Sequence, residues 1–227
     1  MTMNINFEQW TDIICKGAAP FDIVLTEQQI RLFYKHAEEL VQWTRKVNLT
    51  AITDPKEIAI KHFIDSLGPS SFLTSMKHVL DVGSGGGFPG LPLKVLYPSI
   101  ELTLVDAVRK KISFMQHVIR KLGLKGARAI HARIENFNLR DVFTPFDTIV
   151  CRAFSDLSFI IPHALPLLSQ DGKIFVWKGR VPEKEIIDFR RRFREEALLL
   201  TIKVQSYRLP IFDAERSIVR ISKIANT

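Results

Sequence analysis

The sequence predicts an α/β protein in which a doubly wound, mostly parallel sheet follows an N-terminal helical extension and ends in an antiparallel hairpin. Three observations support this prediction. Short apolar runs alternate with amphipathic stretches from about residue 77 onward, a glycine-rich turn directly follows the first of these runs, and the preceding residues show helical spacing without strand-like alternation. Strands separated by helices pair in parallel, which gives a doubly wound sheet.

The first 76 residues are predicted to form the helical extension, and residues 77–227 the main domain. The chain has 227 residues, of which 46% are apolar and 25% charged, as is typical of one globular domain with an appendage. Thr26 precedes a stretch that resembles a helix start, and Ile30 and Phe33 then begin a helical spacing of apolar residues. We therefore expect helices rather than a sheet layer before residue 77.

Seven strands are predicted in the main domain. The five parallel ones are His78–Val82, Ile100–Val105, Ala127–His131, Thr148–Cys151 and Lys173–Trp177. The clearest helical stretch between them carries Ile112, Met115 and Leu122 on one face. Leu198–Val204 and Ser217–Ile221 have no helix between them, so they predict the closing antiparallel hairpin.

A glycine-rich turn follows the first predicted strand. Five of the eleven glycines lie within it: Gly83, Gly85, Gly86, Gly87 and Gly90. Glycine lets the backbone turn tightly and approach a ligand, and a following helix start offers unpaired N–H groups to an anion. A flexible loop is the alternative interpretation, but the strand before the turn and the helical run after it favour a ligand site.

A dinucleotide is one ligand that fits this turn. A P-loop is disfavoured, because no lysine occurs here before Lys94. The spacing G-x-G-x-x-G over residues 85–90 matches the dinucleotide fingerprint, and Asp106 ends the second predicted strand, where a ribose-binding acid belongs. Against NAD, a turn that begins at Gly83 puts Phe88 where close packing requires glycine. The pattern therefore leaves NAD open.

S-adenosylmethionine is the other ligand that fits. Asp81, Gly83, Gly85 and Gly87 form the spacing D-x-G-x-G-x-G, which holds this cofactor on the same kind of sheet. The Asp106 carboxylate would then accept hydrogen bonds from both ribose hydroxyls. Neither ligand requires a metal.

The positive charge of the chain is concentrated in one segment. The net charge is +8, from 32 Lys and Arg against 24 Asp and Glu, and residues 107–133 hold eight basic residues and no acid. Two arginines and two lysines of this segment recur eleven residues apart, which predicts a basic stripe on one helix. Such a surface favours a polyanionic partner, with nucleic acid the first candidate. The residues predicted to contact RNA are Arg109, Lys110, Arg120, Lys121, Lys178 and Arg180.

Other classes of site and location are not supported by the sequence. Cys15 and Cys151 are far apart and lack metal-ligand spacing, so we expect neither a disulfide scaffold nor a metal site. The N-terminus lacks a signal-peptide pattern, and no apolar run approaches the roughly 18 residues of a membrane helix. We therefore expect a cytoplasmic protein.

The segment after the fourth predicted strand bears on the reaction. It lacks the Asn/Asp-Pro-Pro-aromatic loop used to methylate exocyclic amines. Cys151 lies near the place of the nucleophile used for methylation at pyrimidine carbon 5, but a cysteine on a buried strand is more often a small apolar filler. An aromatic ring nitrogen such as guanine N7 already presents a lone pair, so its methylation depends on positioning more than on a general base.

Several stretches together resemble the RsmG (GidB) family of bacterial methyltransferases that act on small-subunit ribosomal RNA. The resemblance covers most of the chain and rests on Trp43, Asn48–Thr50, Lys61–Ser66, Asp81–Leu93, Val105–Asp106, Lys110, Arg133–Glu135, Arg152–Phe154, Lys178–Gly179 and Glu215–Arg216. It implies a Rossmann-like class I S-adenosylmethionine-dependent methyltransferase fold. It also implies methyl transfer to N7 of a guanosine in 16S ribosomal RNA, either as RNA or in the small ribosomal subunit.

The resemblance also assigns residues by position. Phe88 would cover the cofactor, Ile134 and Glu135 would lie near its adenine, and Arg152 would orient guanine or phosphate. Independently of the resemblance, Lys178 lies at the carboxyl end of the fifth predicted strand, the binding edge of an open parallel sheet, and could also orient guanine or phosphate. A structural salt bridge is the alternative role for Arg152. The predicted cofactor-binding residues are Gly83, Gly85, Gly87, Phe88, Asp106, Ile134, Glu135 and Arg152. An NAD-dependent oxidoreductase and a non-catalytic RNA-binding module are the alternative functions.

Overall fold

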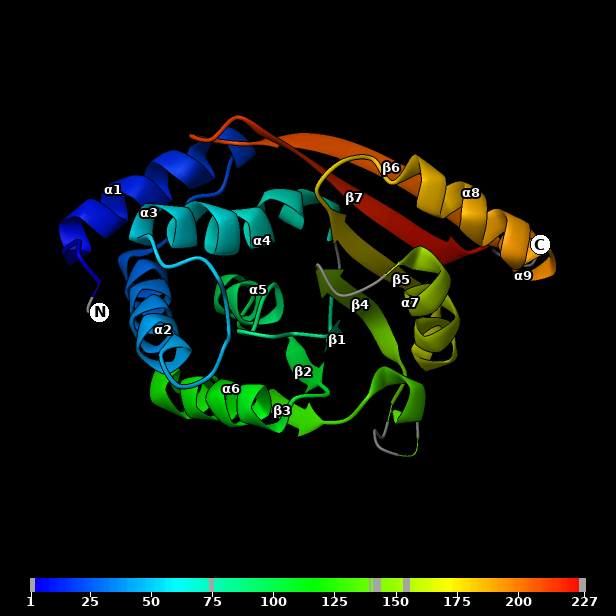
Figure 1. The fold of residues 1–227 in the computed structure, drawn as a ribbon, viewed down its shortest axis with the longest axis horizontal. Helices are drawn as coiled ribbons and strands as arrows, with labels where there is room; N and C mark the ends of the chain where they lie inside the picture. Colours follow the sequence, from blue (N-terminus) through cyan, green and yellow to red (C-terminus); the bar gives the residue numbers. More distant parts are fainter. Residues whose placement is uncertain (1–2, 74–75, 139, 141–143, 153–155, 225–227) are drawn as a thin grey trace.

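The computed structural model describes residues 3–73, 76–138, 140, 144–152 and 156–224. One seven-stranded sheet runs through the molecule in the order β3-β2-β1-β4-β5-β7-β6, and α1 and α9 lie at opposite ends of its long axis (Figure 1). The strands are β1 (His78–Val82), β2 (Glu101–Asp106), β3 (Ala127–His131), β4 (Phe146–Arg152), β5 (Leu168–Lys178), β6 (Leu200–Leu209) and β7 (Ala214–Lys223). The doubly wound sheet is as predicted.

The N-terminal segment is helical, and its described residues contain no strand. Asn6 and Thr26 each form a capping box with a glutamine three residues later, which satisfies two N–H groups at each helix start. The elements are α1 (Phe7–Ala18), η1 (Ala19–Phe21), α2 (Glu27–Thr44), α3 (Pro55–Ile58), η2 (Ala59–Ile64), α4 (Asp65–Leu67) and η3 (Gly68–Phe72). The segment η2 is a π-helix.

These N-terminal helices share a hydrophobic core with one face of the sheet. Trp10, Phe33 and Phe63 are fully buried in the same cluster as α5 (Gly90–Leu96) and α6 (Arg109–Leu122). In Figure 1, α2 lies beside α6, and α3 and α4 lie above α5. The domain boundary at residue 76 stays a prediction. Because the N-terminal helices and the sheet domain bury their apolar side chains in one cluster, each covers apolar surface of the other.

The remaining helices cover the opposite face of the sheet. They are η4 (Ile134–Asn136), α7 (Leu157–Ala164), η6 (Leu165–Leu167), α8 (Glu183–Arg192) and α9 (Arg194–Leu198). Alternate residues of each central strand face the two cores, so Val79 belongs to the first cluster and Leu80 to the second. Cys151 is fully buried in the second cluster. None of the described helices is long and apolar enough to cross a membrane.

Pairing makes several strands longer than their apolar runs. β6 and β7 pair antiparallel from Leu200↔Lys223 to Leu209↔Ala214, which confirms the predicted hairpin but extends both strands through polar residues. β6 begins later than predicted because Leu198 belongs to α9. Ladder hydrogen bonds hold these polar residues in strands, although their side chains give no apolar alternation.

The sheet has a switch point between β1 and β4. These strands are parallel neighbours, but the chain leaves β1 toward β2 on one side and β4 toward β5 on the other. The connections that leave the carboxyl ends of β1 and β4 therefore run in opposite directions. Open α/β sheets bind ligands in the crevice between two such connections. The glycine-rich turn lies at the carboxyl end of β1.

Candidate functional site

The glycine-rich turn begins immediately after β1 and is fastened to β2. Gly83, Gly85 and Gly87 have φ values of 69°, 55° and 87°, a backbone region that favours glycine. The Gly83 N–H donates to the Val105 carbonyl at 2.8 Å, and the Gly85 N–H donates to Asp106 Oδ2 at 3.0 Å. The turn thus has one defined conformation, with its backbone open to a ligand.

Asp106 ends β2 beside this turn. Its carboxylate accepts from Gly85 on one oxygen and from the Val108 N–H at 2.8 Å on the other, and the Lys111 ammonium lies 3.9 Å from Oδ2. Each carboxylate oxygen can accept more than one hydrogen bond. The carboxylate is therefore held in place and keeps acceptor capacity for two adjacent hydroxyls.

Asp81 supplies an unpaired acceptor below the turn. The residue is fully buried, its Oδ2 accepts from the Gly90 N–H at 2.8 Å, and its Oδ1 has no hydrogen-bond partner among the described residues. Burial raises the pKa of Asp81 to about 7. A buried acceptor without a partner is costly, so a cationic or N–H donor bound here would stabilise the ionised carboxylate.

A pocket of about 190 Å³ lies between this turn and the N-terminal helices. The N-terminal segment, the turn, the start of α6 and the end of β4 all contribute to its wall. The lining residues are Leu40, Leu49, Thr50, His62, Gly83, Ser84, Gly85, Gly86, Phe88, Lys111 and Arg152. The helical extension therefore forms part of the candidate site.

Phe88 is packed between two histidines. The His36 and His62 rings stack on Phe88 with centroids 4.9 Å and 4.8 Å away and interplanar angles of 7° and 17°. Phe88 is only 5% exposed. Two stacked imidazoles occupy the ring, so Phe88 has little surface left with which to cover a cofactor.

Both histidines are held neutral. Burial lowers the pKa of His36 to about 4, and burial together with the charge of Arg152 lowers that of His62 to about 3. Arg152 Nη2 donates to His62 Nδ1 at 3.1 Å, so the other ring nitrogen carries the proton and donates to Thr50 Oγ1 at 2.9 Å. Neither nitrogen of His62 is free to take a proton.

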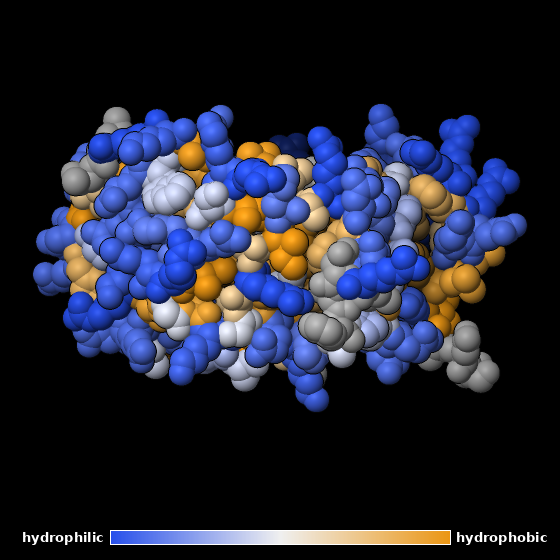
Figure 2. Space-filling view, turned by 90° about the horizontal axis from the view of Figure 1, so that it is seen from below, coloured by the Kyte–Doolittle hydropathy of each residue, from blue (hydrophilic) through white to orange (hydrophobic). Residues whose placement is uncertain are grey.

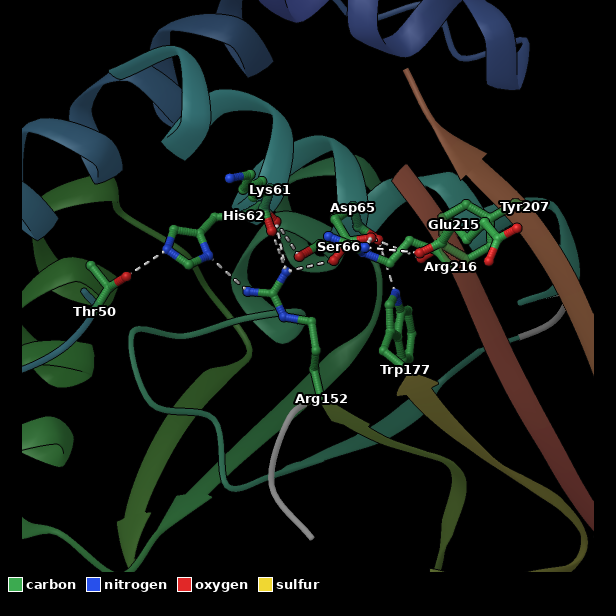
Figure 3. A network of polar contacts seen from close by, with 10 residues as sticks. All are labelled: Thr50, Lys61, His62, Asp65, Ser66, Arg152, Trp177, Tyr207, Glu215 and Arg216. Carbon is green, nitrogen blue, oxygen red and sulfur yellow. Dashed lines mark hydrogen bonds and ion pairs between the residues drawn. The ribbon is translucent and has the colours of Figure 1, made fainter. Parts of the chain in front are cut away.

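Arg152 ends β4 and points toward the π-helix (Figure 3). Its Nη1 donates to the backbone carbonyls of Lys61 and His62 at 2.9 and 3.3 Å and lies 3.4 Å from Asp65 Oδ2. A π-helix changes the carbonyl pattern of the segment and is frequent at functional sites. The alternative role of Arg152 in a structural ion pair is therefore present, and the same side chain lines the pocket.

Asp65 joins four elements through its carboxylate and carbonyl. Besides Arg152, its carboxylate accepts from the Tyr207 hydroxyl at 2.9 Å and lies 3.4 Å from Arg216 Nε. Its backbone carbonyl accepts from Trp177 Nε1 at 2.9 Å. Figure 3 shows these side chains converging from β4, β5 and the β6–β7 hairpin. This cluster fixes the hairpin and the end of β4 against the helical extension.

Ile134 and Glu135 lie away from this pocket. They belong to η4, after β3, and line a separate pocket of about 570 Å³ with residues of α7 and η6, including His163. Ile134 is buried and Glu135 is exposed. The structure does not bring these two predicted cofactor residues and the glycine turn into one cavity, so their role stays a prediction.

The residues predicted to contact RNA lie in two places, along α6 and at the end of β5. Arg109 and Lys110 are exposed at the start of α6, and Arg120 and Lys121 at its end. Figure 2 views the molecule from the side on which α6 lies in Figure 1, and hydrophilic residues cover most of this face. One acid from outside the segment neutralises part of the stripe, because Glu39 of α2 lies 3.7 Å from the Lys121 ammonium.

Lys178 and Arg180 differ in how accessible their charged groups are to RNA. Lys178 forms an ion pair with Glu185 at 2.6 Å, whereas Arg180 is exposed in the loop that follows β5. The arginines 190, 191, 192 and 194 are exposed on α8 and α9 but form no ion pair with another described residue. In the sequence these arginines lie among Glu185, Asp188, Glu195 and Glu196, which predicts a salt-bridged surface helix. That prediction is wrong for the described residues, because none of the four arginines pairs with an acid there.

Sequence reasoning missed several residues that build the site. Neither His36 nor the contacts of Tyr207 and Trp177 with Asp65 could be read from local spacing, since the partners are 50 or more residues apart. Their only sequence signal is polar or aromatic character within apolar stretches, which predicts burial but not a partner.

The residues fit S-adenosylmethionine. The turn offers a glycine backbone that a ligand can approach closely, and Asp106 offers a fixed carboxylate. Asp81 Oδ1 is a buried acceptor without a hydrogen-bond partner among the described residues. A Cβ on Gly90 would come within 2.6 Å of Asp81 Oδ2, so glycine there also allows the close packing of helix on strand. A cofactor with ribose hydroxyls and an ammonium group would supply donors to these two carboxylates.

Known proteins with similar sequences are methyltransferases. The family described as rRNA small subunit methyltransferase G matches residues 29–214. A protein named ribosomal RNA small subunit methyltransferase G from Geobacter sulfurreducens is 44% identical over 209 residues, covering 92% of this chain and 95% of its own. A protein of the same name from Thermoanaerobacter sp. is 36% identical, covering 95% and 90%.

Solved structures show the same fold. A ribosomal protein L11 methylase from Lactobacillus delbrueckii superposes with a TM-score of 0.55 at 17% identity, over 73% of this chain and 79% of that one. A precorrin-6y C5,15-methyltransferase from Geobacter metallireducens gives 0.54 at 12% identity, over 76% and 90%. The fold is that of class I methyltransferases, as predicted.

Proposed function

Because this chain belongs to the rRNA small subunit methyltransferase G family, it is an rRNA methyltransferase, and we propose that it methylates N7 of a guanosine in 16S ribosomal RNA. Its family and fold imply S-adenosylmethionine as the methyl donor. Family membership favours methyl transfer over the NAD-dependent and non-catalytic alternatives. The cytoplasm, where ribosomal RNA is assembled into subunits, is the proposed location.

The protonation state and hydrogen bonds of His62 are the observation that supports methylation at guanine N7. S-adenosylmethionine supplies, when bound, an electrophilic methyl group on a sulfonium sulfur. Guanine N7 has a lone pair and no proton to lose, so the protein need not supply a base. Among the described residues lining the pocket, the only histidine has both ring nitrogens in hydrogen bonds and a pKa of about 3. An exocyclic amine would need a proton acceptor that these residues do not offer.

The glycine turn and two acids are proposed to hold the cofactor. Gly83, Gly85 and Gly87 would let the backbone approach the cofactor closely, since their own N–H groups donate within the protein. Asp106 would accept from the ribose hydroxyls. Asp81 is the candidate for its ammonium group, because Oδ1 is buried and has no hydrogen-bond partner in the part of the chain that the structure describes. The proposed contacts of Phe88, Ile134, Glu135 and Arg152 rest on the family resemblance.

The proposed RNA path crosses the carboxyl edge of the sheet. Arg152 lines the pocket with its guanidinium fixed by the π-helix, so it would orient the guanine or its phosphate. Arg109 and Lys110 follow Asp106 closely and would meet the backbone beside the pocket, whereas Arg120 and Lys121 lie one helix length away. Lys178 is proposed to orient substrate from its ion pair with Glu185.

Chemical mapping of the modified base tests the function. RNA from a strain lacking the protein should lose one borohydride–aniline cleavage stop in 16S RNA, and purified protein with S-adenosylmethionine should restore it. Naked 16S RNA, 30S particles and tRNA are compared as substrates with labelled cofactor. An unchanged cleavage pattern refutes N7, and transfer of label to tRNA alone refutes the 16S assignment.

Calorimetry tests the cofactor site. Asp106→Asn should weaken binding of S-adenosylmethionine at least about tenfold, as expected when a hydrogen bond to a charged group is lost. Asp188→Asn, on the exposed face of α8, is the matched control and should bind normally. NAD should not bind either form. Equal affinity of the two variants would show that Asp106 does not hold the ribose.

A further inference from the structure

A second pocket, rich in arginine, opens beside the candidate site. It has a volume of about 260 Å³ and lies between the loop after β5 and the β6–β7 hairpin. Three arginines and one glutamate are its charged lining residues: Arg180, Arg208, Arg216 and Glu215. The balance is positive, and guanidinium groups match the geometry of phosphate oxygens.

The loop that carries Arg180 is fixed at this pocket. Its backbone carbonyl accepts from the Ser217 hydroxyl of β7 at 2.9 Å, and Ser217 is fully buried. The Arg180 guanidinium forms no ion pair with any residue that the structure describes. A positioned backbone with an unpaired guanidinium leaves its donors available to an anion.

The other two guanidiniums already have carboxylate partners. Arg208 Nη1 lies 2.6 Å from Asp213 at the exposed tip of the hairpin. Arg216 Nε lies 3.4 Å from Asp65 Oδ1, and its Nη1 donates to the Glu215 carbonyl at 2.9 Å. An anion in the pocket would therefore meet one free arginine and two whose positions are set.

Asp65 connects this pocket with the candidate site. Its Oδ1 faces Arg216, which lines the arginine pocket, and its Oδ2 faces Arg152, which lines the site at the glycine turn. The two pockets are thus separated by one carboxylate and the two guanidiniums on it (Figure 3). That separation suits neighbouring groups of a single ligand strand.

We propose that the arginine pocket is a phosphate subsite for the RNA strand next to the target guanosine. The proposal rests on the proposed function, because it takes the guanosine to lie at the glycine turn. Arg180 would make the direct contact, Arg216 would form the wall shared with Asp65, and Arg208 would extend the positive surface along the hairpin. RNA would then be held on the hairpin side of the sheet as well as beside α6.

Salt-dependent RNA binding tests this subsite. Full-length protein is titrated with a fluorescent single-stranded RNA oligonucleotide at several KCl concentrations, in the wild type and in Arg180→Gln. Each phosphate contact contributes about 0.7 to the slope of log K against log salt for a single strand. Arg180→Gln should lower the magnitude of the slope by about 0.7 and weaken RNA binding several-fold at low salt. Affinity for S-adenosylmethionine should be unchanged.

The matched control is Arg191→Gln. Arg191 is exposed on α8 and forms no ion pair with a described residue, so this variant makes the same change of net charge away from the pocket. Equal slopes for the two variants overturn the proposal. Equal slopes in an enzyme that methylates 16S RNA reject the subsite alone, whereas a wild type that binds RNA but transfers no methyl group rejects the proposed function.

Discussion

Replacing Asp65 should destabilise the protein more than removing any one of the hydrogen bonds that Asp65 accepts. Asp65→Ala removes the carboxylate that faces Arg152, Tyr207 and Arg216, but it keeps the backbone carbonyl that accepts from Trp177. The Asp65 and Arg152 side chains are only 8% and 12% exposed. The substitution therefore leaves a nearly buried guanidinium without its counter-charge and a tyrosine hydroxyl without its acceptor.

The expected cost follows from this geometry. Removing one partner of a buried ion pair costs about 3–5 kcal/mol, because the other charge stays buried and uncompensated. Tyr207→Phe removes only the hydroxyl that donates to Asp65, and a hydrogen bond to a charged group contributes about 1.5–3 kcal/mol. The free energy of unfolding should thus fall in the order wild type, Tyr207→Phe, Asp65→Ala.

Urea denaturation followed by circular dichroism measures these differences. Asp213→Asn is the control, since asparagine tolerates the positive φ of residue 213. The ion pair that it removes, with Arg208, is mostly exposed, and exposed pairs contribute at most about 1 kcal/mol. A loss below about 1 kcal/mol for Asp65→Ala, or a loss equal to that of Asp213→Asn, would refute the reasoning. It would mean that water reaches Arg152 as soon as the carboxylate is gone.

Three further predictions concern the glycine turn and its neighbours. The pKa of His36 is lowered to about 4, so the unfolded chain takes up this proton first as the pH falls. The contribution of His36 to the free energy of unfolding should therefore fall by about 3 kcal/mol between pH 6.5 and 4, measured by urea denaturation as the difference between the wild type and His36→Gln. The pKa of Asp81 is raised to about 7, so its ionisation opposes folding as the pH rises from about 4 to 7, and Asp81→Asn should abolish this dependence while weakening S-adenosylmethionine binding at pH 8 by calorimetry. Gly90→Ala would place a Cβ 2.9 Å from Leu104 and should cost about 1–3 kcal/mol by overpacking, whereas Gly179→Ala meets nothing within 4 Å and should be neutral.

The order of elements could be predicted from the sequence, since it depends on local patterns. All seven strands lie where apolar runs predicted them, and Thr26 begins α2 as expected. The π-helix over residues 59–64 was not predicted, because its apolar spacing over six residues does not differ from that of an α-helix. Strand ends were missed where pairing, rather than apolar character, holds polar residues in the ladder.

The candidate site was predictable in its glycine turn, in Asp106 and, through the family resemblance, in Arg152. Gly83, Gly85 and Asp106 are close in space because β1 and β2 are parallel neighbours in register, Val82 opposite Val105, and a parallel sheet dictates this proximity. The stacking of His36 and His62 on Phe88 depends on how the helical extension packs against the sheet. No spacing within the sequence encodes that packing.

The shared core explains why the helical extension is part of the site rather than an appendage to it. Leu40, Thr50 and His62 come from the extension and line the pocket, and Asp65 of the same segment holds Arg152. A ligand that binds between the extension and the glycine turn gains contacts only when the two are docked, so its binding free energy adds to the stability of that docking. The placement of positive charge matters in a similar way. Outside residues 107–133 the basic and acidic residues are equal in number, yet Arg152, Arg180 and Arg216 lie together at the carboxyl edge of the sheet. Their placement at this edge, rather than the net charge of +8, is what would bring an RNA strand to the methyl donor.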